Sequence, residues 1–518
     1  MNIKEIKSGA VLSYLLILAN TFYGLFFVPF LISRLGQGEY GVYKIIASLI
    51  GSVTILDLGI GGTILRYIAK FNAENDKKNL SNFSAMGFIE ATGLALIMLA
   101  VGIIIYFCLD KVYGNSLTAE ELSKAKELFI LFLIILIMST YEKVVFGIIA
   151  GCEHYAFANL LKLLRIVLKI IISAVLLLKI SDSAILLLVE IGLLIVMMAI
   201  QFRYIRKKIG IRIKFYYWDK TLFGQSFKYT ILTFIQSVAV QFNGNLDNMV
   251  IGSVLGAAEV AVYSVGLQLY SMFEQFALAF SDLMLPSVSK QIAEGADNRS
   301  LEDTVIKIGR FEFIALAGAL GGFIVIGKEF INLWLGKDYL SAWTVAIILM
   351  IPTVIPLIQN VCLSILRAKN KMGFRTAAVS VMAVFNLLIT VIGVKIYGSI
   401  AACIGTAAGL ILANIIAMNI YYIKVMHLNI WRIFGGIFSR TLPCCVISTL
   451  LFLLINSFIH NSNWIIWIFK VICFVIIYGA LLLLYGLNGS EKRVLFGKIL
   501  KTERKSDYED TFNDISHS

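Results

Sequence analysis

Basic side chains recur at helical spacing inside an apolar stretch of the chain. Lys162, Arg165 and Lys169 are three and four residues apart, so a helix over residues 160–179 places them on one face. Arginine and lysine donate charge-assisted hydrogen bonds to phosphoryl oxygens, and such a stripe suits a phosphate or a pyrophosphate. Two structural interpretations compete with this one. They are snorkelling of the Lys162 side chain to a membrane boundary, and pairing of the stripe with Glu142, Glu153 or Glu190.

Polar side chains also line one face of other apolar stretches. Over residues 229–251 the aligned side chains are Gln236, Asn243 and Asp247, and over 259–282 they are Ser264, Gln268, Ser271, Gln275 and Asp282. These groups suit hydrogen bonds to sugar hydroxyls in a wet cavity, or equally bonds between helices that contribute ~0.6 kcal/mol each. The residues that we predict to bind substrate also include Asn20, Tyr23 and Lys44, which lie earlier in the chain.

Several carboxylates also lie inside apolar stretches. Ionisable groups at membrane depth are costly, and they mark ion and proton pathways. The candidates for carrying a coupling proton or sodium ion are Asp57, Glu90, Glu142, Glu190, Glu274 and Asp282. The sequence does not choose among them, and Asp57 equally suits the capping of a broken helix before the glycines of GIGG.

Motifs of known enzyme mechanisms are absent from the sequence. It has no phosphate-binding loop, no nucleophile elbow and no HExxH pair, and its seven cysteines show no paired metal-ligand spacing. We therefore predict no catalytic residue, no metal and no cofactor. A membrane glycosyltransferase or polymerase is a further alternative, but the largest predicted outer loop, about 108–127, is short for holding an acceptor.

Membrane helices must position these residues. Of the 518 residues, 59% are hydrophobic and 15% are charged, and apolar runs extend almost from end to end. A spanning helix needs ~20 mostly apolar residues. About fourteen runs qualify, at 9–33, 41–64, 83–107, 128–150, 160–179, 184–204, 229–251, 259–282, 309–335, 343–366, 376–396, 400–423, 441–460 and 465–487. The predicted fold class is an all-α polytopic membrane protein.

The distribution of lysine and arginine predicts the orientation. These residues concentrate in alternate loops, at 66–78, 203–228, 367–375 and 424–440, and in the tail after 492. The intervening loops hold few of them, and this asymmetry is the positive-inside rule. Both termini are therefore predicted to be cytoplasmic, in a multi-pass protein of the cytoplasmic membrane. The net charge of +13 is explained by these loops, so no nucleic-acid partner is predicted.

Two stretches carry a family resemblance. LGQGEYGVY from Leu35 and DLGIGGTILR from Asp57 are similar to the start of the polysaccharide flippases, which belong to the multidrug/oligosaccharidyl-lipid/polysaccharide exporter superfamily. The first stretch has an echo about 220 residues later, where Leu255, Gly256, Glu259, Val262 and Tyr263 repeat its spacing. A shared spacing in two parts of a membrane protein indicates structurally repeated halves.

The resemblance implies a V of two six-helix lobes around a cavity that is cationic in the sugar-exporting branch. It also implies alternating access. The lipid II flippases of this superfamily likewise have fourteen helices. We predict an N-lobe at 1–204, a basic cytoplasmic linker at 205–228 and a C-lobe at 229–423. Two further helices at 424–487 and a cytoplasmic tail at 488–518 complete the chain.

The cargo that the resemblance implies is an undecaprenyl-pyrophosphate-linked oligosaccharide, such as an O-antigen or capsule repeat unit. The predicted partners are this lipid-linked oligosaccharide and the membrane lipids, with a polysaccharide polymerase and chain-length machinery as further candidates. A multidrug or cation antiporter of the same fold is the alternative, and an acidic, aromatic cavity would favour it. Coupling to a returning proton or sodium ion, the sugar and the oligomeric state are left open by the sequence.

Overall fold

The computed structural model describes residues 12, 15–54, 59–218, 224, 246–369, 371–459, 463–489 and 491–492, with the backbone alone for 279–289, 293 and 368. Three predicted site residues, Asp57, Gln236 and Asn243, lie outside the described residues, and so does the side chain of Asp282. The described segments fold into helices joined by short connections, and they contain no strand.

The first half of the chain contains η1 (Tyr23–Phe27), α2 (Val28–Val53), α3 (Ile60–Ala73), α4 (Lys77–Tyr113), α5 (Ala119–Gly151), α6 (Tyr155–Leu177), α7 (Ala184–Tyr204) and η3 (Ile205–Ile209). The second half contains a short helix (Leu246–Leu255), α9 (Ala257–Ala293), α10 (Asn298–Leu335), η4 (Lys337–Tyr339), α11 (Ser341–Ile358), α12 (Asn360–Ala368), α13 (Gly373–Tyr397), α14 (Ser399–Gly409), η5 (Leu410–Ala417), α15 (Met418–Lys424), α16 (Ile430–Ser457), α17 (Trp464–Leu481) and η6 (Leu482–Gly486).

The all-helical, polytopic fold predicted from the sequence is confirmed, but the number of fourteen helices is not. Within the described segments, ten helical stretches are long and apolar enough to cross a membrane. The predicted helix over 41–64 does not continue unbroken, because α2 ends at Val53 and α3 begins only at Ile60. At Gly36 the backbone of α2 departs from helical geometry, with φ 76° and ψ 171°, values that favour glycine.

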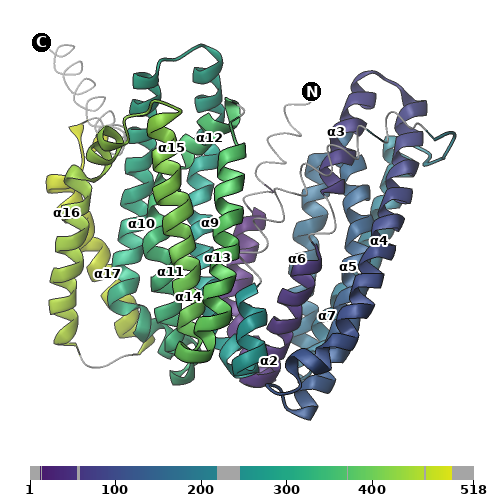
Figure 1. Ribbon diagram of the computed structural model, residues 1–518, viewed down its shortest axis with the longest axis horizontal. Coiled ribbons are helices and arrows are strands. Elements are labelled where there is room, and N and C mark those ends of the chain that lie inside the picture. Colours follow the sequence, from purple (N-terminus) through teal and green to yellow (C-terminus); the bar gives the residue numbers. More distant parts are fainter. Residues whose placement is uncertain are drawn as a thin grey trace, which may run out of the picture. The chain divides into compact units, whose positions relative to one another are not determined.

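The helix contacts divide the chain into two compact units. The first comprises Met1–Met272, Thr344–Leu349 and Gly373–Asn414, and the second comprises Phe273–Trp343, Met350–Met372 and Ile415–Ser518. Figure 1 shows α2 to α7 in purple to blue and the later helices in teal through green to yellow. The lobe, linker and tail boundaries drawn from the sequence stay a prediction.

Local sequence explains where the helices of the first unit begin and how closely they pack. Thr118 and Glu121 form a capping box at the start of α5, with Thr118 N donating to Glu121 Oε2 over 2.9 Å. The glycines of GIGG permit close packing, since a Cβ on Gly147 of α5 would lie 3.0 Å from the carbonyl oxygen of Gly61 in α3. Apolar side chains such as Ile64 and Val144 fill the core between α3, α4 and α5.

In the second unit, α10 packs against α16 and α17. Arg310 is 4% exposed, and its guanidinium makes a salt bridge to Glu491, with Nε 2.6 Å from Oε1. Lys470 is 1% exposed and pairs with Glu329 over 2.8 Å. Both basic side chains are therefore buried and paired with a carboxylate.

Candidate functional site

A cavity of about 420 Å³ opens within the first unit, a size typical of ligand pockets. It is bounded by the first helical stretch (residues 15–27), α2, α6 and α7. The residues that line it are Asn20, Tyr23, Val28, Leu31, Tyr40, Tyr43, Lys44, Ala47, Arg165, Ile166, Lys169 and Glu190. Three cationic side chains and one carboxylate line this space, so we call it the cationic cavity.

The basic stripe of α6 reaches this cavity while it is paired with acids. Lys169 Nζ lies 2.9 Å from Glu190 Oε2 of α7. Arg165 Nη1 donates to Glu142 Oε2 of α5 over 2.8 Å, and Arg165 Nε lies 3.6 Å from Glu190 Oε1. The Arg165 and Lys169 side chains keep 24% and 21% of their surface exposed. The stripe can therefore be paired with acids and still be open to a phosphate in the cavity.

Lys44 supplies the third cation from α2. Its Nζ lies 5.4 Å from the centre of the Tyr40 ring, and its side chain is half-buried. Among the described residues, no acidic side chain forms an ion pair with Lys44. In this cavity Lys44 is thus the cation whose charge is not balanced by a nearby carboxylate.

Lys162 belongs to the predicted stripe but lies outside the cavity lining. Its Nζ sits 3.6 Å from the centre of the Phe146 ring. This position is a cation–π contact between α6 and α5. A substrate-binding role for Lys162 stays a prediction.

Asp247 occupies a separate cluster of hydroxyl groups inside the same unit. Its side chain is 3% exposed and accepts hydrogen bonds from Tyr263 Oη at 2.7 Å, Thr406 Oγ1 at 2.7 Å and Thr390 Oγ1 at 3.2 Å. Asn386 Nδ2 donates to Thr406 Oγ1 over 3.0 Å. The sequence grouped Asp247 with predicted sugar-binding amides, whereas here hydroxyl groups from α9, α13 and α14 donate to it.

The other predicted side chains are dispersed. Gln268 Nε2 donates to the carbonyl oxygen of Gly24 over 2.7 Å, which ties α9 to the first helical stretch. Glu90 and Glu274 are half-buried, and neither lines the cationic cavity. Ser271 is half-buried and Gln275 is exposed. Roles for these residues in binding or coupling stay predictions.

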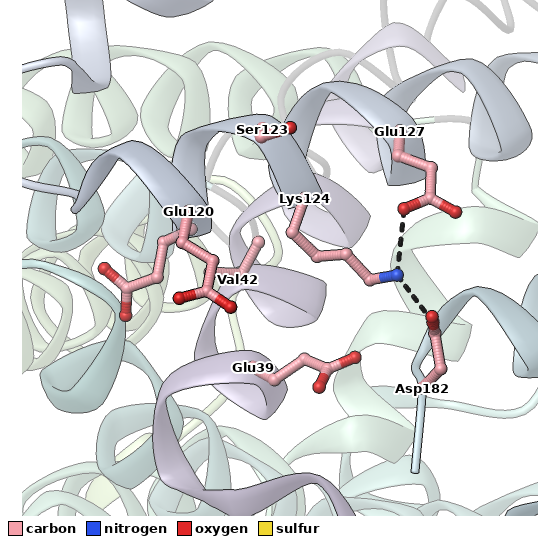
Figure 2. Close-up of a pocket in the computed structure, with 8 residues that line it drawn as sticks. Glu39, Val42, Glu120, Ser123, Lys124, Glu127 and Asp182 are labelled. Atoms are coloured by element: carbon pink, nitrogen blue, oxygen red, sulfur yellow. Dashed lines mark hydrogen bonds and ion pairs between the residues drawn. The ribbon is translucent and has the colours of Figure 1, made fainter. Parts of the chain in front are cut away.

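A second cavity of about 470 Å³ is acidic, and the sequence analysis did not find it (Figure 2). Its lining is Glu39, Val42, Glu120, Glu121, Ser123, Lys124, Glu127 and Asp182. Figure 2 shows Lys124 between two carboxylates, with its Nζ 2.9 Å from Glu127 Oε2 and 2.6 Å from Asp182 Oδ1. We call it the acidic pocket.

The connection between α6 and α7 is fastened at the acidic pocket. Ser183 N donates to Glu39 Oε1 over 2.6 Å. Burial alone would raise the pKa of Asp182, but hydrogen bonds from the Lys124 ammonium and the Ala184 backbone N–H lower it overall. On α2, Glu39 faces this pocket while Tyr40 and Lys44 face the cationic cavity.

The fold is that of multi-pass transporters with solved structures. The chain matches the structure titled "Lipid II flippase MurJ, inward closed conformation" with a TM-score of 0.69 and 16% identity, over 95% of this chain and 99% of that one. It also matches an inward-facing multidrug resistance MATE family transporter of the MOP superfamily, with a TM-score of 0.63 and 15% identity, over 78% and 94% of the chains.

The sequence comparisons identify the family. A family model described as "Polysaccharide biosynthesis protein" matches residues 6–292, and the chain belongs to this family. A Haloferax volcanii protein named "Probable low-salt glycan biosynthesis flippase Agl15" is 22% identical over 35% of this chain and 38% of its own length. A Salmonella typhi protein named "Putative O-antigen transporter" is 23% identical over 60% of this chain and 69% of its own. The family inferred from LGQGEYGVY and DLGIGGTILR is confirmed.

Proposed function

We propose that this protein is a flippase that moves undecaprenyl-pyrophosphate-linked oligosaccharide units across the cytoplasmic membrane, and that it is not an enzyme. The observation that carries the proposal is the cationic cavity, in which three basic side chains from α2 and α6 meet one carboxylate. A pyrophosphate cannot cross hydrocarbon unaided, because burying an unpaired charge is prohibitive. A cavity that offers Lys44, Arg165 and Lys169 lowers that barrier, while the lipid tail stays in the bilayer.

The ion pairs suggest how cargo is bound and released. Lys169 and Arg165 already contact Glu190 and Glu142, so an incoming pyrophosphate must compete with these carboxylates for the same donors. Lys44 has no such competitor among the described residues, which makes it the first contact for the phosphate in this scheme. Re-pairing of Glu190 with Lys169 then favours release. Alternating access with both termini cytoplasmic is part of the proposal.

Ion coupling has two candidate positions within the first unit. Protonation of Glu190 would free Lys169 for cargo, so proton entry and cargo binding would be linked directly. Asp247 offers a buried carboxylate surrounded by threonine and tyrosine oxygens, an arrangement suited to a proton or a sodium ion. Measuring transport against imposed proton and sodium gradients separates the two ions.

A flipping assay in proteoliposomes tests the proposal. Fluorescent undecaprenyl-pyrophosphate-linked oligosaccharide should move between leaflets with the parent protein, and Arg165→Ala with Lys169→Ala should abolish that movement at equal reconstitution. Unchanged movement of the oligosaccharide by the double variant would refute the cationic cavity as the binding site. Lys111→Ala, which removes an exposed lysine outside the cavity lining, is the matched control.

A multidrug or cation antiporter is the second candidate, and the acidic pocket favours it. Five carboxylates and one lysine line that pocket, a balance that suits a cationic molecule. Uptake of a cationic dye into proteoliposomes distinguishes the two functions. Dye uptake sensitive to Glu39→Gln and Glu120→Gln, with no movement of the lipid-linked oligosaccharide, would establish the antiporter instead.

A further inference from the structure

The segment over residues 211–218, predicted as part of the basic linker, is fastened to the start of α4. Tyr216 N donates to Asn82 Oδ1 over 2.8 Å and Tyr217 N does so over 3.2 Å. Asn82 Nδ2 returns a hydrogen bond to the carbonyl oxygen of Tyr217 over 3.0 Å. Ser81 accepts from Lys214 N over 3.2 Å and also donates to the carbonyl oxygen of Arg212. Figure 1 shows this segment beside α4.

The amide that holds the segment is itself buried. Asn82 is 2% exposed, so its hydrogen bonds to the segment satisfy polar atoms that water does not reach. Ile205, before the segment, and Ile211, at its start, belong to the core between α3, α4 and α5. The backbone over 211–218 is thus tied to the bundle both by apolar packing and by hydrogen bonds.

Four consecutive aromatic side chains project from this fixed backbone. Phe215, Tyr216, Tyr217 and Trp218 are 44%, 47%, 40% and 41% exposed. Each such side chain has a large apolar area to bury, and tyrosine and tryptophan gather where headgroups meet hydrocarbon. Asn82 holds the backbone of Tyr216 and Tyr217, so these rings offer apolar area at the outside of the bundle.

Basic side chains surround the rings. Lys214 Nζ lies 5.3 Å from the centre of the Tyr216 ring, and Lys78 Nζ lies 6.0 Å from that of Tyr217. Arg206, Lys207 and Lys208 are exposed in η3, directly before the segment. Among the described residues, the acids between α3 and α4 are Glu74, which lies 4.0 Å from Lys70, and Asp76, which caps α4 through Asn79. The surface is therefore strongly positive, with aromatic rings at its centre.

We propose that residues 206–218, together with Lys77 and Lys78, form a docking surface for anionic phospholipid headgroups. The surface lies where α4 begins and α7 ends, at the level where spanning helices leave the hydrocarbon. Lysine ammonium groups contact lipid phosphates, and the rings enter the headgroup layer beside them. The inference does not depend on the transported cargo, and it holds in a symmetric bilayer whichever way the protein is oriented.

Lipid retention by the purified full-length protein tests this surface. The protein is placed in nanodiscs of phosphatidylcholine, with or without phosphatidylglycerol, and bound lipid is counted by native mass spectrometry. A triple variant, Lys207→Gln, Lys208→Gln and Lys214→Gln, should lose phosphatidylglycerol affinity by about fivefold for each lysine, from ~1 kcal/mol per basic residue near an anionic surface. The loss should shrink as salt is added.

A matched variant controls for net charge. Lys369→Gln, Lys371→Gln and Lys424→Gln remove three exposed lysines elsewhere and should weaken phosphatidylglycerol binding less than the first triple variant does. Equal melting temperatures of all three proteins in phosphatidylcholine show that folding is intact. Equal losses in the two variants, or no loss in either, would overturn the proposal. Co-purification of an acidic protein with the parent alone, without any lipid preference, would assign the surface to a protein partner.

Discussion

The pair formed by Lys169 and Glu190 gives the sharpest test of how the cationic cavity binds a phosphate. Lys169 Nζ and Glu190 Oε2 are 2.9 Å apart, and both residues line the cavity. Lys169→Gln removes a donor to the phosphate and also leaves Glu190 facing it. The double variant Lys169→Gln, Glu190→Gln removes the same donor without leaving the acid. Comparison of the two variants therefore separates the attraction of the phosphate by Lys169 from its repulsion by Glu190.

The expected magnitudes follow from these contacts. A hydrogen bond to a charged group contributes ~1.5–3 kcal/mol, so loss of the donor alone lowers affinity by about 10- to 150-fold. A carboxylate about 4 Å from a phosphoryl charge adds repulsion of about 4 kcal/mol at an effective dielectric constant of about 20. Arg165 Nε remains 3.6 Å from Glu190 and offsets part of that repulsion. We expect the single variant to bind at least 100-fold more weakly, and the double variant to recover about tenfold.

The assay is equilibrium binding of undecaprenyl pyrophosphate to purified protein, which reports the phosphate contact without transport. Quenching of the intrinsic tryptophan fluorescence, or competition with a labelled analogue, gives the affinity of each variant. If the double variant binds no better than Lys169→Gln, then Glu190 does not compete with the ligand, and the proposed exchange between carboxylate and phosphate is wrong.

Four further outcomes follow from the geometry of the first unit and of the glycines. Glu190→Gln alone should tighten binding of undecaprenyl pyrophosphate and slow its transport, because Lys169 is then free at all times. A change of affinity and transport rate in the same direction would contradict this. Where Asp247 rather than Glu190 carries the coupling ion, Asp247→Asn should abolish the dependence of transport on that ion; in either case it should cost about 1–3 kcal/mol of stability, measured by transport under opposed gradients and by thermal unfolding. Gly41→Ala should lower the melting temperature strongly, since its Cβ would lie 1.9 Å from a backbone carbonyl oxygen of α9, whereas Gly435→Ala has open space and should not. The pKa of Asp182 is lower in the folded protein than its usual 3.8, so its pair with Lys124 stabilises the fold above about pH 3.8. That contribution is lost as the pH falls through the still lower pKa of the folded state. Asp182→Asn should therefore flatten the acid side of the curve of stability against pH.

The sequence predicted the part of the site that a single helix contains. Three- and four-residue spacing is a property of one helix, and it put Arg165 and Lys169 on one face before any neighbour was known. Lys44 was included as a candidate from its place in an apolar run, but only tertiary packing shows that it reaches the same cavity from α2. The sequence offered the pairing of Arg165 with Glu142 as one of several alternatives, and the packing of α5 against α6 brings these two side chains together.

Other features depend on contacts between distant segments, and the sequence could not supply them. Asp247 shares a helical face with Gln236 in the sequence pattern, yet two of the three hydroxyl groups that donate to it belong to Thr390 and Thr406, more than a hundred residues away, and the third belongs to Tyr263. The acidic pocket gathers Glu39, the start of α5 and Asp182. Its one local signal was the capping box of Thr118 with Glu121, which marks where α5 begins and so where its first acids cluster.

The sequence analysis drew one helix over 41–64 and gave a break before GIGG only as an alternative role for Asp57, whereas α3 begins at Ile60. Hydropathy runs on through this stretch, so a window of apolar residues predicts one continuous helix over 41–64. Glycine-rich spacing in LGIGG was the available signal, because Gly59 adopts φ 70° directly before α3. A pattern of glycines therefore deserves more weight than hydropathy at such a place.

Movement of the lipid-linked oligosaccharide itself tests the central claim most directly. Proteoliposomes that hold the parent protein, the Arg165→Ala with Lys169→Ala variant or the Lys111→Ala control are loaded with a fluorescent undecaprenyl-pyrophosphate-linked oligosaccharide, and its accessibility to an external quencher is followed. We expect the parent and Lys111→Ala to equilibrate the cargo between leaflets and the double variant to leave it where it was loaded. Equal movement in all three would contradict the claim that basic side chains of the cationic cavity carry the phosphate.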